Sequence, residues 1–421
     1  TALSNKDGAG GGGIMIGLNG TGGEVTITGA SEINSNVVTV GTGKASGIHC
    51  GGGGILLQRG KLFITGTTQI NNNEAGHGSA IKVQCDDDGA GGGLFIGGSG
   101  TDSVVISGNH NQNQVAEGGS QMGAAITLIQ GIADLKNVTI DNNHNYHNNG
   151  LGGGFLIGAG SKGATISDSV ISNNSAAGGG GVYINKNRLT IGDNVKVHDN
   201  EAKALAFGYG RGGGINANNE STLTITGKNV EIYNNIARCS LYGSGGGIYL
   251  IDSDHTIADG SGVYIYNNQG PLGGGIAIDR TCNVEIHDAK IHDNTATSNG
   301  GGIYIAGGRS GALAGGPAVK LGGTTEIYGN TANNGAGVYL GGSATYLTSL
   351  TITDQTDIHD NNTTGGTSRN GGGIYVAGRG ILVVNSADVK IRDNTAGGHG
   401  GGIYIAANGN VTLSAGTLSG N

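Results

Sequence analysis

One repeat of this chain opens with Gly371-Gly372-Gly373-Ile374-Tyr375-Val376 and closes with Ile391-Arg392-Asp393-Asn394. Between these segments lie the apolar runs Ile381-Leu382-Val383-Val384 and Val389-Lys390-Ile391, each preceded by a turn. Aliphatic residues alternate with Tyr or Lys in the first and last of the three apolar segments, which is the period-2 pattern of a strand with one buried face. The repeat therefore predicts three short strands with no helix between them.

The same combination of a glycine block, apolar strands and an aliphatic-x-x-Asn closure recurs thirteen times along the 421 residues. A unit of this size can bury its apolar side only against its neighbours, so such a repeat indicates a solenoid and not a string of separate domains. We expect an all-β parallel β-helix of about thirteen rungs, with residues 1–421 forming a single domain.

An asparagine stands three residues after the closing aliphatic residue in every unit. Stacked rungs lie about 4.8 Å apart, so each amide can bond to the amide of the next rung. Asparagine also tolerates the left-handed conformation of a sharp corner. We therefore expect a structural ladder. Its members are Asn36, Asn73, Asn109, Asn143, Asn174, Asn200, Asn235, Asn268, Asn294, Asn330, Asn361, Asn394 and Asn421.

The glycine blocks, such as Gly152-Gly153-Gly154, have a structural explanation of the same kind. Where the chain re-enters the solenoid, a side chain would clash with the rungs on either side, and glycine allows close backbone approach. A phosphate-binding loop would require a helix after the glycines, and no helical pattern follows any of these blocks.

The pairing of Gly245-Gly246-Gly247-Ile248 with Ile265-Tyr266-Asn267-Asn268 resembles the GGA[IVL] and FxxN repeats of polymorphic outer-membrane proteins of chlamydiae and related bacterial surface adhesins. The resemblance covers essentially the whole chain, although Ile, Val or Leu replaces the family's Phe. It implies a right-handed β-helix at the cell surface, with adhesion as the usual role.

Composition narrows the range of partners and compartments. A net charge of −8 with few charged residues offers no basic patch for a phosphate backbone, so nucleic acid is a poor candidate partner. No apolar run approaches the length of a membrane span. Few lysines and many Asn, Thr, Ser and Gly favour an extracellular or cell-surface location. The chain begins at Thr1, which we interpret as a processed or excised piece.

Variable insertions of a solenoid often form its binding face, and the longer ones here fall in residues 37–50, 74–90 and 110–124. His144, Tyr146 and His147 are candidates for the same surface, and a metal site at them would lack an acidic or Cys partner nearby in sequence. Asp86-Asp87-Asp88 is either a weak Ca²⁺ site or a solvated acidic turn; we expect no cofactor. Cys50 and Cys85 occupy equivalent loops of successive rungs, so these two residues form either a disulfide or two separate thiols.

A tyrosine column is expected on the outside of the first strand of each repeat. These residues stand between two inward aliphatic residues, and stacked rungs would align them. They are Tyr183, Tyr249, Tyr304, Tyr339, Tyr375 and Tyr404. One interpretation is cross-rung packing that stabilises the sheet, and the other is an exposed platform for sugar rings or a neighbouring protein. The equivalent N-terminal positions, assigned as Met15, Leu56, Phe95 and Leu156, fit protein contact better.

Catalysis is the alternative from another class, because β-helices also carry polysaccharide-active enzymes. The best cluster is His359-Asp360 near Arg392-Asp393, with His292-Asp293 two rungs away. These Asp residues replace Asn or Gly at a turn position, which is ordinary turn chemistry. We therefore predict no catalytic residues and a non-enzymatic protein; the alternative is a polysaccharide-binding or polysaccharide-degrading β-helix.

The two ends of the sequence fit each other. The chain finishes on the closing Asn421 and starts with Thr1-Ala2, and Asn is followed by Thr-Ala inside the chain, as at Asn294-Thr295-Ala296. Joining the ends would continue the repeat, and neither end shows a divergent polar cap. We expect copies to stack end to end as a fibre or tandem array, with surface glycans or host proteins as further candidate partners. A larger protein trimmed at a motif boundary explains the same ends.

Overall fold

The computed structural model describes residues 2–3, 11–17, 23–39, 51–85, 92–98, 100–111, 123, 125–203, 210–238, 244–258, 262–306, 316–342 and 346–421. The chain divides into two compact units, Thr1–Gly210 and Arg211–Asn421. Strands, turns and irregular segments make up all of the described residues. No helix among them is long and apolar enough to cross a membrane.

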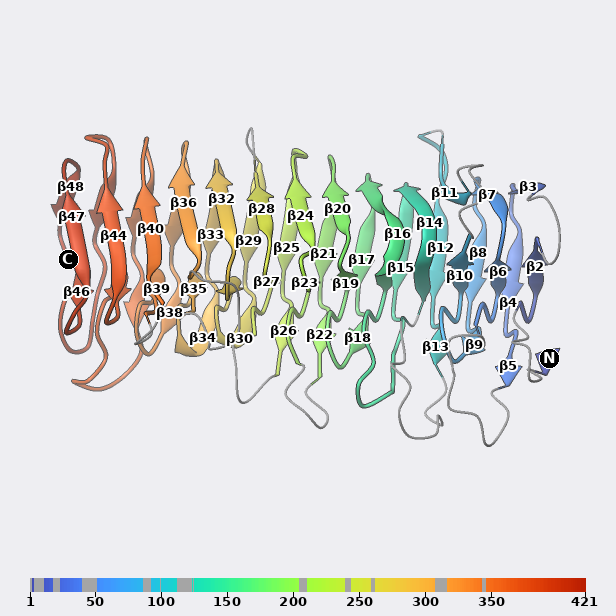
Figure 1. Cartoon of the computed structure of the whole chain (residues 1–421), viewed down its shortest axis with the longest axis horizontal. Helices are drawn as coiled ribbons and strands as arrows, with labels where there is room; N and C mark the ends of the chain where they lie inside the picture. Colours follow the sequence, from blue (N-terminus) through green and yellow to red (C-terminus); the bar gives the residue numbers. More distant parts are fainter. Residues whose placement is uncertain are drawn as a thin grey trace. The chain divides into compact units, whose positions relative to one another are not determined.

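In the first unit, parallel strands from successive rungs lie side by side in stacks (Figure 1). The first-strand stack contains β2 (Ile14–Ile16), β6 (Ile55–Leu57), β10 (Ile81–Gln84), β14 (Ile126–Lys136), β16 (Phe155–Ser167) and β19 (Val182–Asn185). The second-strand stack contains β3 (Gly23–Ile27), β7 (Gly60–Ile64), β11 (Gly93–Ile96), the later parts of β14 and β16, and β20 (Arg188–Ile191). The third-strand stack contains β4 (Glu32–Asn34), β8 (Gln69–Asn71), β12 (Val104–Ser107), β15 (Val138–Asp141), β17 (Val170–Ser172) and β21 (Lys196–His198).

The second unit repeats this arrangement with seven rungs counted by their third strands. Its first strands are β23 (Ile215–Asn218), β27 (Ile248–Ile251), β31 (Ile276–Asp279), β35 (Ile303–Ile305), β39 (Val338–Leu340), β43 (Ile374–Val376) and β46 (Ile403–Ile405). Its second strands are β24 (Thr222–Ile225), β28 (Asp254–Ile257), β32 (Asn283–His287), β36 (Ala318–Gly322), β40 (Thr348–Ile352), β44 (Gly380–Val384) and β47 (Asn410–Leu413). Its third strands are β25 (Val230–Tyr233), β29 (Val263–Tyr266), β33 (Ala289–His292), β37 (Glu326–Tyr328), β41 (Asp357–His359), β45 (Lys390–Arg392) and β48 (Thr417–Ser419).

A fourth short strand follows the ladder asparagine in many rungs, which the three-strand repeat did not predict. In the first unit these strands are β5 (Val38–Thr39), β9 (Glu74–Ala75), β13 (His110–Asn111), β18 (Ser175–Ala176) and β22 (Glu201–Ala202), and β1 (Ala2–Leu3) pairs with β5. In the second unit they are β26 (Ile236–Ala237), β30 (Gln269–Leu272), β34 (Thr295–Asn299), β38 (Thr331–Ala332) and β42 (Asn362–Thr363). They pair in parallel like the longer strands, for example Thr331 with Asn362.

The core of each unit consists of the inward aliphatic residues that the period-2 pattern predicted. In the third strands of the second unit, Ile232, Ile265, Ile291, Ile327, Ile358 and Ile391 are all fully buried. Strand register places each directly beside its counterpart in the next rung, as with Ile327 and Ile358. Each rung therefore buries its apolar side against its neighbours.

The asparagine ladder is confirmed within each unit. Asn174 donates from its backbone N–H and its side-chain amide to the Oδ1 of Asn200, each at 3.0 Å. In the second unit the same two bonds run from Asn294 to Asn330, also at 3.0 Å. Most of these side chains are buried, so the ladder satisfies backbone and amide donors that would otherwise lack partners.

The left-handed corner falls on the residue before each ladder asparagine and not on the ladder asparagine itself. Positive φ angles near 55° occur at Asn142, Asn173, Asn267 and Asp360. Asn, Asp and Gly reach this region most easily, because a short polar side chain can bond locally and glycine has no Cβ. The ladder position is set by hydrogen bonding and the corner by the residue before it.

The glycine blocks are confirmed as sites of close approach. The first glycine of a block, such as Gly273, has a φ of +67°. A Cβ on the next, Gly274, would lie 2.6 Å from the carbonyl oxygen of Gly301, and one on Gly275 would lie 2.7 Å from that of Gly302. Each block thus combines one left-handed residue with two positions that the neighbouring rung closes to any side chain.

Candidate functional site: the side-chain columns of the rungs

A column of stacked aromatic rings runs along the outside of the third strands in the second unit. The ring centroids of Tyr233 and Tyr266 are 4.9 Å apart and those of Tyr266 and His292 are 5.1 Å apart. Tyr328 continues the stack at 4.7 Å from His292, and His359 lies 5.1 Å beyond it. The ring planes differ by 7° or less at every step. Our sequence interpretation missed this column, although its members all directly follow the aliphatic residue of the aliphatic-x-x-Asn motif.

A second outward column lies two residues earlier on the same strands. Strand register aligns Glu231, Tyr264, Lys290, Glu326, Asp357 and Lys390. The Tyr266 hydroxyl donates to Glu231 at 2.7 Å, and burial together with this carboxylate raises the pKa of Tyr266. Lys290 lies 3.3 Å from Glu326, and this carboxylate raises the pKa of the ammonium group. The two columns cover the outward side chains of β25, β29, β33, β37, β41 and β45. We call the surface that these side chains form the β25–β45 face.

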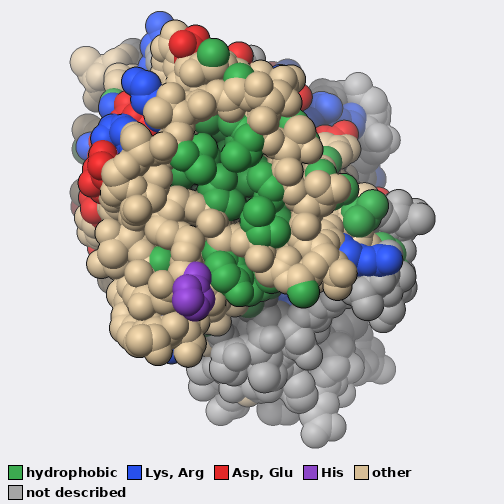
Figure 2. Space-filling view, turned by 90° about the vertical axis from the view of Figure 1, so that its left-hand side faces the viewer, with side chains coloured by type: hydrophobic (Ala, Val, Ile, Leu, Met, Phe, Trp, Pro, Cys, Tyr) green, Lys and Arg blue, Asp and Glu red, His purple; other side chains and the backbone are tan. Residues whose placement is uncertain are grey.

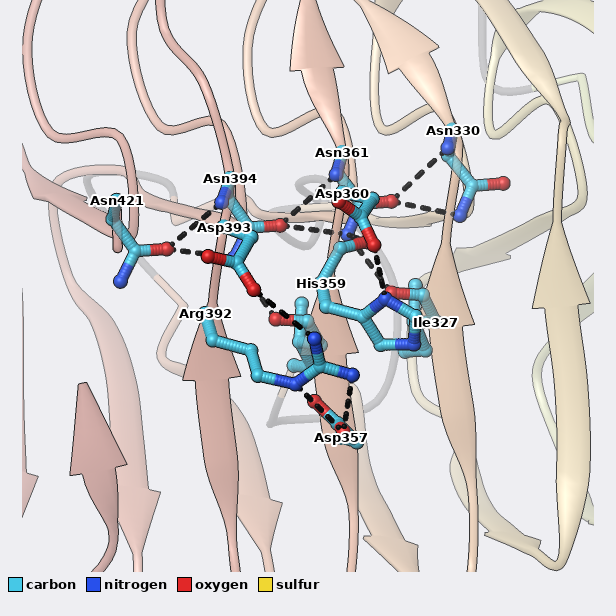
Figure 3. Close-up of polar contacts among 11 residues, drawn as sticks. Ile327, Asn330, Asp357, His359, Asp360, Asn361, Arg392, Asp393, Asn394 and Asn421 are labelled. Atoms are coloured by element: carbon cyan, nitrogen blue, oxygen red, sulfur yellow. Dashed lines mark hydrogen bonds and ion pairs between the residues drawn. The ribbon is translucent and has the colours of Figure 1, made fainter. Parts of the chain in front are cut away.

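The cluster considered for catalysis includes residues of this face, His359 and Arg392, and the corner residues that follow them. His359 Nδ1 is 2.7 Å from Asp360 Oδ2, while Arg392 donates to Asp357 at 3.1 Å and to Asp393 at 3.0 Å (Figure 3). The same His–Asp contact occurs at His292–Asp293 in this unit and at His198–Asp199 in the first. Positive φ angles at Asp293, Asp360 and Asp393 confirm these carboxylates as corner residues. Because the His–Asp contact recurs at the same position of several rungs, the repeat itself explains why it is present, without any role in binding a substrate.

The predicted tyrosine column on the first strands forms only in part. Tyr304, Tyr339, Tyr375 and Tyr404 stack with centroids 5.3, 4.9 and 5.0 Å apart, and their side chains are half-buried. Burial raises the pKa of Tyr339 and Tyr375. These four residues therefore contact one another across rungs, as in the first of the two interpretations, with the last pair tilted by 33°.

Tyr183 and Tyr249 do not belong to an exposed column, which corrects the prediction for both. Tyr183 is buried and Tyr249 is fully buried. The Arg211 guanidinium carbon lies 5.1 Å from the Tyr249 ring centroid, and the Tyr249 hydroxyl donates to Asp279 at 3.1 Å. Ala277 stands between Tyr249 and Tyr304 in the register, so the aromatic stack is interrupted there. Other residues of the same chain, such as Arg211, therefore cover Tyr249, a position that strand alternation alone assigned to solvent.

The corresponding positions of the first unit differ from one another. Leu56 and Leu156 are buried, Met15 is partly exposed, and Phe95 does not share their column. Phe95 lies on β11 in the second-strand stack, where its ring stacks on Phe63 at 5.0 Å. The assignment of Phe95 to the first strand was wrong, because the sequence Gly91-Gly92-Gly93 before it imitates the glycine block of a first strand, whereas the first strand of that rung is β10.

Ring geometry bears on sugar binding. A sugar stacks on the face of an aromatic ring. In both columns the faces are turned toward the next ring at about 5 Å, so solvent meets ring edges, hydroxyl groups and imidazole nitrogens. The columns therefore have the geometry of cross-rung packing, with polar ring edges as the chemistry they offer to a partner.

His144 and Tyr146 come together in the first unit, with ring centroids 5.7 Å apart. His144 Nδ1 lies 2.8 Å from Ser175 Oγ, and burial, with the Lys203 charge, lowers the pKa of His144. Tyr146 is exposed, and burial lowers the pKa of His147. The fold also brings His110 beside Tyr146, at 6.0 Å between ring centroids. This surface stays a candidate for binding.

Other predicted sites lie outside the described residues. They are Cys50, Asp86, Asp87 and Asp88, together with most of the insertions in 37–50 and 110–124 and the end of 74–90. Cys85 is described and buried, with its Sγ 3.6 Å from the Gly60 carbonyl oxygen. Within the described ranges, no three His, Cys, Asp or Glu side chains are grouped so as to hold a metal ion.

The last rung of the second unit presents apolar side chains on its outer surface. Ile405, Leu413 and Leu418 are 49%, 47% and 47% exposed. Their counterparts one rung earlier, Val376, Val384 and Ile391, are fully buried. Figure 2 shows hydrophobic side chains gathered at the centre of this end, bordered by backbone and other side chains, with charged groups mainly along the upper left edge. The outer surface of the last rung therefore exposes side chains whose counterparts in the preceding rung form the core.

Comparison with protein families supports the architecture. A family model described as "Right handed beta helix region" matches residues 213–418. No curated protein and no solved structure matches the chain. The parallel strand stacks and this match together show an all-β, right-handed parallel β-helix, a fold that does not by itself fix an activity.

Proposed function

We propose that this β-helix is a non-enzymatic structural protein of the cell exterior that assembles end to end, its last rung receiving the first rung of a second copy. The observation that carries the proposal is the outer surface of the last rung, where Ile405, Leu413 and Leu418 are half-exposed although each continues a buried column. Covering half-exposed aliphatic side chains is favourable by about 25 cal/mol per Å² of apolar area.

Hydrogen bonding supports a directional joint. Along the ladder, each asparagine donates from its N–H and amide to the Oδ1 of the following one. Asn421 accepts from Asn394 at 3.0 and 2.9 Å, and its own backbone N–H and second amide hydrogen lie on the side of the next rung. At the other end, Asn36 donates to Asn73 at 3.0 and 2.9 Å, so its Oδ1 is the acceptor that a preceding rung would use. Donors at one end thus match an acceptor at the other.

Strand β1 supports the same register. Ala2 pairs with Val38, two residues after Asn36, just as Ala332 pairs with Thr363, two residues after Asn361. Ala2–Leu3 therefore occupies the fourth-strand position that directly follows a ladder asparagine. In a head-to-tail joint, Asn421 of one copy would stand in the same rung as strand β1, Ala2–Leu3, of the next copy. Such a heterologous contact repeats without closing and yields a fibre.

The first rung is suited to the other side of the joint. Val25 and Ile27 are partly exposed, whereas Leu62 and Ile64, beside them in the next rung, are fully buried. The non-enzymatic part of the proposal rests on the His–Asp pairs, whose repetition at one corner position is explained by the rungs themselves. The extracellular part rests on a composition poor in Lys and rich in Asn, Thr, Ser and Gly.

The test uses the 421-residue chain and electron microscopy with sedimentation velocity over a concentration series. We expect fibres that lengthen with concentration for the wild type and single chains for Leu418→Lys, because a charge would then lie inside the joint. Leu347→Lys is the matched control, since Leu347 is 55% exposed and does not lie on the last rung. Single chains of wild type at every concentration, or unchanged assembly of Leu418→Lys with an intact fold by circular dichroism, would refute the proposal.

A further inference from the structure

The β25–β45 face is flat and regular, with two outward residues on each of six strands. One column consists of Glu231, Tyr264, Lys290, Glu326, Asp357 and Lys390. The other consists of Tyr233, Tyr266, His292, Tyr328, His359 and Arg392. All of these side chains are partly or fully exposed.

Charge on this face is balanced. Glu231, Glu326 and Asp357 oppose Lys290, Lys390 and Arg392, so the face has no net charge with its histidines neutral. The whole chain carries −8, and two copies repel one another over most of their surfaces. A neutral face with aromatic edges is where two copies can approach at least electrostatic cost.

The order of the charges is self-complementary under a twofold axis. Consider an axis in the plane of the face, parallel to the strands and midway between β33 and β37. It turns a second copy face to face with the first, reverses the order of the rungs and keeps each column opposite itself. Lys290 then faces the second copy's Glu326, and Glu231 faces its Lys390. Tyr264, a hydrogen-bond donor, faces Asp357.

The aromatic column is matched by the same operation. Arg392 comes opposite the second copy's Tyr233, which is a cation–π pairing. His292 comes opposite Tyr328, and Tyr266 opposite His359, so each remaining contact joins two aromatic rings. A parallel arrangement with rungs in register would instead reverse the strands and exchange the two columns. Lys390 would then come opposite the second copy's Arg392, a like-charge contact, and Glu231 opposite its Tyr233, so neither residue would form an ion pair. Charge order therefore selects the antiparallel pairing.

We propose that the β25–β45 face binds the same face of a second copy in this antiparallel, twofold-symmetric arrangement. An isologous contact of this kind closes after two chains. The face measures roughly 25 Å by 10 Å, which is small, so a single pair of chains associates weakly. Where chains are already joined end to end, many such contacts act together and pack fibres side by side. The pairing itself does not require fibres, and it can be tested without them.

The experiment is a charge-reversal cycle in the Leu418→Lys background, which blocks the end joint. Glu231 and Lys390 lie five rungs apart, about 24 Å within one chain, so they couple only across a dimer. Glu231→Lys and Lys390→Glu each create two like-charge contacts per dimer, and we expect each to weaken dimerisation about tenfold in sedimentation and small-angle scattering. The double variant Glu231→Lys/Lys390→Glu recreates both ion pairs in reverse and is expected to restore dimerisation to within about threefold of the parent.

Circular dichroism and thermal melting of all four proteins verify that each is folded. The proposal is overturned when the double variant dimerises no better than the single ones, or when the parent stays monomeric at the highest attainable concentration. Failure of end-to-end assembly is read separately, from wild type against Leu418→Lys, so each hypothesis stands or falls by its own comparison.

Discussion

Asn361 donates two hydrogen bonds to the side-chain oxygen of Asn394, one from its backbone N–H at 3.1 Å and one from its amide at 2.9 Å. Asn330 donates to Asn361 in the same way. Replacing Asn361 with Ala therefore leaves two buried donors of Asn330 without an acceptor, at about 1–3 kcal/mol for each. We expect the free energy of unfolding, measured by denaturant titration, to fall by about 2–6 kcal/mol.

Asn385→Ala is the matched control, because Asn385 is exposed and lies outside the ladder. Its stability should stay within about 0.5 kcal/mol of wild type. Equal losses for the two variants would show that the ladder contributes nothing specific.

The glycine blocks give a second prediction. A Cβ on Gly275 would lie 2.7 Å from the Gly302 carbonyl oxygen in the next rung and 3.1 Å from the amide of Asn294, which closes its own repeat. Gly275→Ala must therefore separate two rungs, and we expect a loss of about 1–3 kcal/mol with faster amide hydrogen exchange in both. Gly100→Ala is the control, since a Cβ there meets nothing within 4 Å. Unchanged stability and hydrogen exchange of Gly275→Ala would show that the two rungs can move apart at no cost in free energy.

The sequence predicted the features that repeat at every rung and was less successful where one rung differs from the next. Strand alternation, the ladder at positions such as Asn294 and the closed glycine sites follow from local rules that each unit obeys. The burial of Tyr249 does not, because it depends on Arg211, which lies outside the motif. Phe95 was misplaced because Gly91-Gly92-Gly93 before it imitates the glycine block of a first strand, and the alternation pattern does not distinguish a first strand from a second.

The aromatic column was within reach of the sequence. Tyr266, His292 and Tyr328 each follow the inward aliphatic residue of the same motif, so aligning the repeats on Asn places them together. The tyrosines of the first strands are easier to recognise, because they stand beside the glycine blocks, whereas the column on the third strands mixes tyrosine with histidine. The opposition of Glu231 and Lys390 in a dimer could not be predicted, because it requires the register of six separate strands.

Tyr328 provides a third prediction, on the energy of the aromatic column. Its ring stacks on His292 at 4.7 Å and on His359 at 5.1 Å. Tyr328→Ala removes both contacts, each of which stabilises by about 0.5–1.5 kcal/mol beyond the area buried. Thermal unfolding should therefore occur at a lower temperature, whereas Tyr328→Phe, which keeps the ring, should melt close to wild type. Equal melting of the Ala and Phe variants would show that stacking along the column does not stabilise the fold.

His255 is the exception in its core column, and it makes stability depend on pH. Its side chain is 2% exposed, and register places it beside Val284 in the next rung. Its Nδ1 accepts a hydrogen bond from the Leu223 N–H at 3.1 Å, which requires the neutral ring. Burial, only partly offset by Asp254, lowers its pKa from 6.5 to about 4.

Between pH 4 and 6.5 the unfolded chain binds a proton at His255 that the folded chain does not, so stability rises with pH through this window. The contribution is complete above pH 6.5 and is smaller by about 3 kcal/mol below pH 4. His255→Asn offers a non-titrating acceptor to the Leu223 N–H, and His255→Leu removes the acceptor as well. Denaturant titrations at several pH values should give a shallower pH slope for both variants than for wild type. At pH 7 the Leu variant should be the less stable of the two, because it alone leaves a buried donor without a partner. Parallel pH profiles for wild type and both variants would assign the acid sensitivity to other groups.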